Sequence, residues 1–206
     1  MPNRLYFYNT PRLLHRLMKK LTWRRQVQDD TIFLTFDDGP SPDVTPWVLE
    51  QLNIYNAKAT FFCVGSNMLK HPEIFREVEN NGHTIGNHTF DHLNGWKVAT
   101  KDYLQNISQF AQVYPTPLFR PPYGKISPPQ ISALLKKNYE IVMWSILSYD
   151  FDAKLPRLTS MKKIQGAKPG QIIVFHDNPK AGKNLKYLLP HTLEHFAGRG
   201  FNFASL

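Results

Sequence analysis

The sequence of 206 residues contains one cysteine, Cys63, and no apolar run that approaches the roughly 18 residues a membrane-spanning helix needs. A single cysteine excludes an internal disulfide framework and a cysteine-rich zinc site. No repeat or low-complexity tract is visible. Residues 1–28 contain seven basic side chains but no acidic one. Because this segment has neither a continuous apolar stretch nor a small-residue cleavage site, we expect no cleavable signal peptide.

The composition is that of a folded protein. Apolar residues make up 42% of the chain and charged residues 20%, which is enough for a core and too little charge for a disordered chain. The net charge is +9, but the chain beyond residue 28 is near neutral, with 18 basic and 16 acidic side chains. The net charge therefore does not indicate nucleic-acid binding. We expect a basic N-terminal extension, residues 1–28, and one domain, residues 29–206.

The extension has the pattern of an amphipathic helix. Thr10 is a typical N-cap and Pro11 fits the first helical position. One apolar stripe follows at Leu13, Leu14, Leu17, Met18 and Leu21. Such a helix either lies on the body of the domain or contacts an anionic membrane surface or polymer. We accordingly expect a cytoplasmic protein or one peripheral to a membrane.

From residue 29 on, short apolar runs alternate with amphipathic runs. The runs typical of buried strands are 31–36, 59–64, 84–85, 118–119, 141–144, 172–175 and 201–204. Helices are expected at 43–55, 72–80, 102–113 and 184–197, and another begins after Ser127. About seven such βα units predict a parallel sheet with helical crossovers. A closed or nearly closed β/α barrel fits this pattern best, with an open doubly wound sheet as the alternative.

Reactive side chains follow the ends of the predicted strands, where functional groups gather in both architectures. Asp37 and Asp38 come after the first strand, and His88 and His92 follow the third. The four-residue spacing lets one tight turn present both imidazoles to one side. Two histidines and one carboxylate form a three-ligand set with open positions, which suits Zn²⁺, with Co²⁺ or Ni²⁺ as alternatives. The other carboxylate is then free to act as a base.

Two later strand ends carry further candidates. Arg120 precedes Pro121 and Pro122, which fix the backbone at this point. An arginine held in this way can clamp a carboxylate through a bidentate pair. His176 directly follows the apolar run at 172–175, which is an expected place for a catalytic group.

Four segments carry a resemblance to a known family. They read Thr-Phe-Asp-Asp-Gly-Pro from residue 35, His-Thr-x-x-His from residue 88, Arg-Pro-Pro-Tyr-Gly from residue 120 and Phe-His-Asp from residue 175. In this order they resemble the polysaccharide deacetylase family, also called carbohydrate esterase family four. The resemblance covers nearly all of residues 29–206. It implies a distorted (β/α)7 barrel that removes N-acetyl groups from chitooligosaccharide- or peptidoglycan-like glycans.

The resemblance also implies a metal site and a base. Asp38, His88 and His92 match the family's metal ligands, with zinc as the expected divalent metal. Asp37 matches its catalytic base. The expected partner is an N-acetylated glycan substrate.

The remaining matched residues belong around the same reaction centre. By the resemblance, Arg120 orients Asp37, and the backbone N–H of Tyr123 helps to hold the oxyanion. His176 matches the general acid, and Asp150 matches the aspartate that pairs with this histidine.

Three positions depart from the family pattern. Leu147 stands where an aspartate is usual, Phe151 replaces the tryptophan expected after Asp150, and Phe175 stands where an aliphatic residue is usual. These changes alter the expected wall of the substrate groove, whereas the residues matched to the reaction itself are retained. The alternatives are a hydrolase of a non-sugar amide and a non-catalytic glycan-binding pseudoenzyme.

Overall fold

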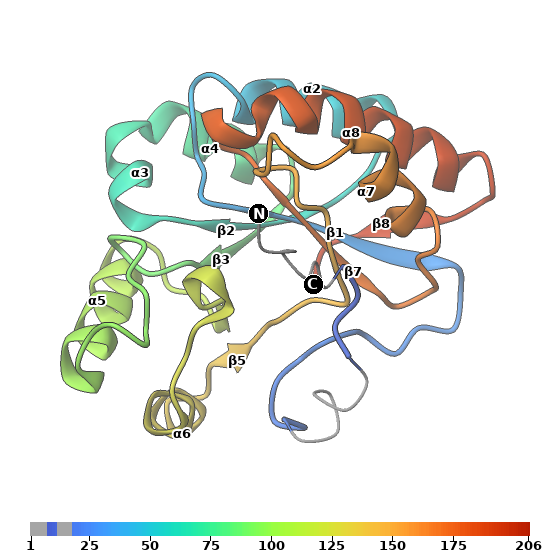
Figure 1. Ribbon diagram of the computed structural model, residues 1–206. Coiled ribbons are helices and arrows are strands. Elements are labelled where there is room, and N and C mark those ends of the chain that lie inside the picture. Colours follow the sequence, from blue (N-terminus) through green and yellow to red (C-terminus); the bar gives the residue numbers. More distant parts are fainter. Residues whose placement is uncertain (1–7, 12–17) are drawn as a thin grey trace.

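A curled parallel sheet organises the computed structural model, which describes residues 8–11 and 18–206 (Figure 1). Its strands are β1 (Thr31–Asp37), β2 (Thr60–Cys63), β3 (Thr84–Asn87), β4 (Leu118–Phe119), β5 (Glu140–Ile141), β6 (Ile146–Leu147), β7 (Ile172–His176) and β8 (Asn202–Ala204). The strand order is β5-β4-β3-β2-β1-β7-β6, and β8 pairs with the start of β1. All these pairs are parallel. The predicted distorted barrel is therefore confirmed, as a curled half-barrel.

Helices connect the strands and cover the sheet. They are α2 (Thr45–Ile54), α3 (Gly65–Lys70), α4 (Pro72–Asn80), α5 (Thr100–Val113), α6 (Pro128–Lys136), α7 (Arg157–Ile164) and α8 (Pro179–Ala197), with a short 3-10 turn η1 (Pro122–Gly124). Figure 1 shows α2, α4 and α8 along one side of the sheet, whereas α5 and α6 lie near its β5 edge. Among the described residues, no helix combines the length and apolarity that crossing a membrane requires.

The central strand β1 is buried on both faces. Alternate residues of β1 pack in the main core with residues of α2 and α8, and the residues between them face the inside of the barrel. A strand covered on both sides reads as a continuous apolar run, which is the pattern seen in the sequence. Phe33, Thr35 and Asp37 share the inner face because side chains alternate along a strand. This alternation brings the Asp37 carboxylate inside the barrel.

The strand predicted at 141–144 is wrong in extent. Strand β5 ends at Ile141, and the separate strand β6 begins at Ile146. The reason is a buried arginine. Arg120 donates hydrogen bonds to the backbone carbonyls of Val142 at 3.3 Å and Met143 at 3.0 Å. The Val142 and Met143 carbonyl groups are therefore occupied by the guanidinium and do not continue the strand.

The helices differ from the prediction in two main ways, beside shifts of one or two residues at the ends of α2 and α5. Helix α8 begins at Pro179 instead of residue 184, because the Asn178 side chain accepts a hydrogen bond from the Ala181 N–H and caps the helix. Helices α3 and α7 were not predicted at all. The apolar signal of α7 is weak, since Met161 and Ile164 are its only buried apolar side chains.

The described parts of the N-terminal extension fill the gap between the two edge strands of the sheet. Asn9 pairs with β6, and Thr22 pairs with the chain just after β5. Leu21 and Trp23 are each 5% exposed and join the core that covers β4 and β5. Residues 12–17, which hold most of the predicted amphipathic helix, lie outside the described residues.

The burial of Leu21 predicts that the extension folds together with the barrel. Leu21→Ala should lower the free energy of unfolding by about 2–3 kcal/mol, through lost burial and the cavity left behind. The matched control is Leu69→Ala in α3, because Leu69 is 59% exposed. That substitution should change the free energy by less than about 0.5 kcal/mol. Urea denaturation measures both values, and equally small effects would mean that the barrel folds without this contact.

Candidate active site

The carboxyl ends of the parallel strands meet at one edge of the half-barrel. Asp37 is the last residue of β1 and lies in register with His176, the last residue of β7. His88 and Arg120 directly follow β3 and β4. These ends surround a cavity of about 320 Å³. The predicted site residues that line it are Asp37, Asp38, His88, His92, Tyr123 and His176.

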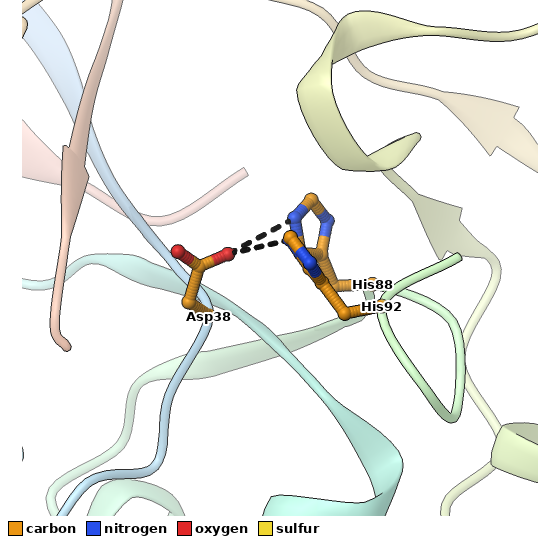
Figure 2. Close-up of side chains that lie close together, drawn as sticks. All are labelled: Asp38, His88 and His92. Atoms are coloured by element: carbon orange, nitrogen blue, oxygen red, sulfur yellow. Dashed lines mark ion pairs between the residues drawn. The ribbon is translucent and has the colours of Figure 1, made fainter. Parts of the chain in front are cut away.

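Asp38, His88 and His92 point toward one another (Figure 2). The Asp38 Oδ1 atom lies 2.9 Å from His92 Nε2 and 3.5 Å from His88 Nε2. One ligand atom from each residue lies within 4.8 Å of the other two. The His88 Nδ1 atom contacts the Arg120 backbone carbonyl at 2.8 Å, which leaves Nε2 directed at Asp38. The donor types and their spacing fit a divalent cation with open positions.

The surroundings of Asp38 favour its charged form. Burial alone would raise the pKa of this carboxyl group. Hydrogen bonds from His88 and His92, with the nearby charge of His176, instead hold its pKa well below the usual range. A carboxylate is the form that ligates a cation.

Asn178 also contacts Asp38 and was not predicted. Its Nδ2 atom donates to Asp38 Oδ2 at 2.6 Å, while its Oδ1 atom accepts from the Ala181 N–H at 2.9 Å. The residue thus caps α8 and orients the carboxylate. The sequence held a signal for it, since Asn178-Pro179 is a typical helix start.

Asp177 is a second residue that sequence reasoning missed. Its carboxyl group accepts hydrogen bonds from the Gly39 N–H at 3.0 Å and the Thr45 hydroxyl at 2.6 Å. Burial raises the pKa of Asp177 to about 7 despite these donors. A Cβ atom at Gly39 would lie 2.0 Å from Asp177 Oδ2, so only glycine permits this approach. Asp177 therefore holds the loop that follows Asp37 and Asp38.

Arg120 is fully buried beside Asp37. Its Nη1 atom donates to Asp37 Oδ1 at 2.7 Å and to Thr35 Oγ1 at 2.7 Å. The guanidinium carbon lies 4.0 Å from the centroid of the Phe62 ring. Arg120 therefore fixes the position of the Asp37 carboxylate. Asp37 borders the cavity without belonging to the group of three that fits a metal.

Asp150 and His176 form a second pair, in which Asp150 is buried and His176 is partly buried. Asp150 Oδ1 lies 2.7 Å from His176 Nδ1, and Oδ2 accepts the backbone N–H of His176 at 2.7 Å. Burial of the imidazole lowers its pKa, but Asp150, together with Asp38 and Asp37, raises the pKa of His176 to about 9. The imidazole is then protonated at neutral pH, with Nδ1 held by Asp150.

Several residues at the cavity have strained backbone. Asp38, His92 and Tyr123 have φ angles of 83°, 56° and 60°, in the left-handed region that favours glycine. The Tyr123 ring packs against His92 with 4.7 Å between ring centroids. Such strain persists where the surrounding structure determines the conformation, as it does at many functional sites.

Comparison with known sequences agrees with this geometry. Residues 24–142 match the family profile of polysaccharide deacetylases. A peptidoglycan-N-acetylglucosamine deacetylase of Bacillus cereus is 32% identical over 193 residues, which cover 90% of this chain and 91% of that protein. Another deacetylase of the same name and species is 36% identical over 154 residues, or 72% of this chain. The match spans only 56% of the length of this second relative.

Comparison with solved structures gives the same result. The Bc1960 peptidoglycan N-acetylglucosamine deacetylase superposes with a TM-score of 0.84 at 29% identity, over 96% of this chain and 95% of that chain. The prediction of a deacetylase-type enzyme is therefore confirmed at the level of the family. The chain belongs to the polysaccharide deacetylase family.

Proposed function

We propose that this enzyme is a metal-dependent N-deacetylase of N-acetylated amino-sugar oligomers or polymers. The observation that carries the proposal is that one cavity joins three parts. These are three residues suited to a divalent metal, a carboxylate clamped by an arginine, and a histidine paired with a buried aspartate. The deacetylase names of the relatives support an acetylated glycan as the substrate.

Asp38, His88 and His92 would hold the metal, and this donor set favours zinc. The chemistry that a divalent cation supplies at such a site is polarisation of a carbonyl and a lower pKa for water. Asp37 stands outside this set, so its carboxylate is available to accept a proton from the attacking water. Arg120 keeps that carboxylate in one position.

We assign His176 the role of the general acid, which donates a proton where Asp37 accepts one. Asp150 holds Nδ1, so the Nε2 proton can pass to the nitrogen of the leaving amine. Without this proton an amide anion would have to leave. We assign the backbone N–H of Tyr123 to the developing oxyanion, where one donor contributes roughly 3 kcal/mol to lowering the barrier.

The central test separates the base from the metal ligand. Asp37→Asn should lower kcat by roughly 10³-fold and leave bound zinc unchanged, because only the proton acceptor is lost. Asp38→Asn should lose both zinc and activity. Acetate release is measured from chitooligosaccharides, peptidoglycan fragments and a non-sugar acetamide, with added Zn²⁺ and with chelator, beside the zinc content of each protein.

Three results of that panel would each overturn a part of the proposal. Full activity of the Asp37→Asn protein would remove Asp37 from the mechanism. Release from the acetamide alone would move the substrate to non-sugar amides. A zinc-loaded protein that is silent on every substrate would contradict deacetylation of these glycans and point to a different substrate or to a domain that binds without catalysis.

A pH profile tests the acid. Asp150 raises the pKa of His176, so Asp150→Asn should lower that pKa. The acid form exists below the pKa, and activity is lost as pH rises through it. The alkaline limb of kcat should therefore move to lower pH in Asp150→Asn but stay in place in the neighbouring control Asp152→Asn. An unmoved limb in Asp150→Asn would contradict the acid role of His176.

Asn178→Ser separates the two contacts of Asn178. Serine can still cap α8, so the unfolding free energy should change little. The amide donor to Asp38 is lost, and zinc should bind about 10- to 100-fold more weakly, as for other supporting residues of metal sites. Competition with a chromophoric chelator measures the zinc Kd, with Asn53→Ser on exposed α2 surface as the control. Unchanged zinc affinity would reduce Asn178 to a helix cap.

A further inference from the structure

Charge is distributed unevenly over the barrel. Residues 152–206 contain nine lysines and arginines against three acidic residues, whereas residues 29–151 contain nine against thirteen. One of the three acids, Asp177, is buried under the active site. Residues 29–206 are near neutral overall, but residues 29–151 carry a net negative charge and residues 152–206, which include α7 and α8, carry a net positive charge.

Five exposed basic side chains lie on the first half of these two helices or just before α7, and the two helices pack against each other. We call them the basic row: Lys154, Arg157, Lys180, Lys183 and Lys186. The three lysines of α8 follow one another at intervals of three residues, which places successive members on neighbouring positions of one helix surface. The Arg157 guanidinium lies 5.4 Å from the centroid of the Tyr187 ring, which joins α7 to this surface of α8.

The basic row begins at the active site. Lys180 lines the cavity, and its Nζ atom lies 5.5 Å from the centroid of the Phe151 ring, which lines the same cavity. A cation over an aromatic face is attracted to it, so Phe151 holds this ammonium at the rim. The exposed acid Asp91 lies next to His92 and lines a neighbouring pocket, which shares Asp38, His92 and Asn178 with this cavity. Exposed groups of opposite charge thus lie near the cavity.

Ion pairing within the fold does not account for the basic row. Within residues 8–11 and 18–206, none of its five members forms an ion pair. Like charges three residues apart on a helix repel each other and destabilise it. A surface with an excess of one charge beside a cavity attracts ligands of the opposite charge and raises their rate of association.

We propose that the basic row binds carboxylate groups of the glycan chain as it leaves the active site, so that the enzyme selects anionic over neutral N-acetylated glycans. This inference rests on the proposed deacetylase function and deepens it. The occupant is the substrate itself, because the basic row is continuous with the cavity. A neutral chitooligosaccharide offers this surface no charge, whereas a glycan that carries acidic sugar substituents or peptides does. The negative charge of Asp91 beside His92 favours the orientation in which the anionic portion lies over α7 and α8.

A matched pair of substrates tests the basic row. The neutral probe is chitopentaose and the anionic probe is chitopentaose carboxymethylated at O6, so the two share the acetylated sugar and differ in charge. The wild-type protein should show the higher kcat/KM on the anionic probe. The ratio of the two kcat/KM values should fall as salt shortens the Debye length from about 10 Å at 0.1 M.

The variant K183E/K186E should lower that ratio by roughly tenfold, the lower end of what electrostatic steering supplies. Both lysines are exposed on α8 and lie outside the residues that line the cavity. The control K136E/K137E makes the same change of charge at the exposed end of α6 and should leave the ratio unchanged. A ratio unaffected by K183E/K186E, or lowered equally by the control, would overturn the proposal.

Direct binding keeps this test independent of turnover. The Kd of each probe is measured by titration calorimetry beside acetate release. If no protein releases acetate, the proposed deacetylase function fails, and the Kd values still decide the role of the basic row. Weaker binding of the anionic probe to K183E/K186E alone supports the proposal, and equal binding to all three proteins overturns it.

Discussion

The buried guanidinium of Arg120 is the constraint on which the active site depends. An unpaired charge in this position would cost several kcal/mol, so the surrounding chain has to supply partners. Asp37 and Thr35 of β1 accept from one side, and the carbonyls that follow Ile141 accept from the other. The backbone carbonyl of Arg120 in turn orients His88. One residue thus links the proposed base, a metal-ligand candidate and the end of β5.

The adjacent acids Asp37 and Asp38 differ because the backbone turns between them. Asp37 continues the extended β1 strand and meets Arg120, whereas Asp38 has a φ angle of 83°. The Asp38 carboxylate consequently lies beside His88 and His92. Two identical side chains acquire separate environments, which is the condition for separate chemical roles. The strain in this turn is balanced by contacts such as the one between Asp177 and Gly39.

Features encoded by local pattern could be predicted from the sequence. The apolar runs at 31–36 and 172–175 locate β1 and β7, and parallel topology then brings Asp37 and His176 to one edge. Contacts between distant segments could not be read in this way. The carbonyls that receive Arg120 belong to a stretch that looks like an ordinary strand, so the break between β5 and β6 was missed.

Asn178 shows a different kind of limit. Its place before Pro179 marks a helix start, but the apolar stripe of α8 becomes regular only farther along the chain, and the stripe decided the predicted boundary. The contact with Asp38 depends on how β1 and β7 are paired. Asn178 and Asp38 are 140 positions apart in the sequence, and such a contact leaves no periodic signal.

The two ion pairs of the site also explain why the N-terminal extension matters for it. On the proposed mechanism, the base is held from the β4 side by Arg120 and the acid from the β6 side by Asp150. Strand β6 has only two residues and lies at the edge of the sheet. The extension supports this edge, since the Leu147 N–H donates to the Tyr8 carbonyl at 2.9 Å and the rings of Tyr8 and Tyr149 lie 4.9 Å apart. Contacts of the extension therefore help to hold the loop that carries Asp150. The extension is thus linked to the position of His176, the proposed acid, as well as to the stability of the barrel.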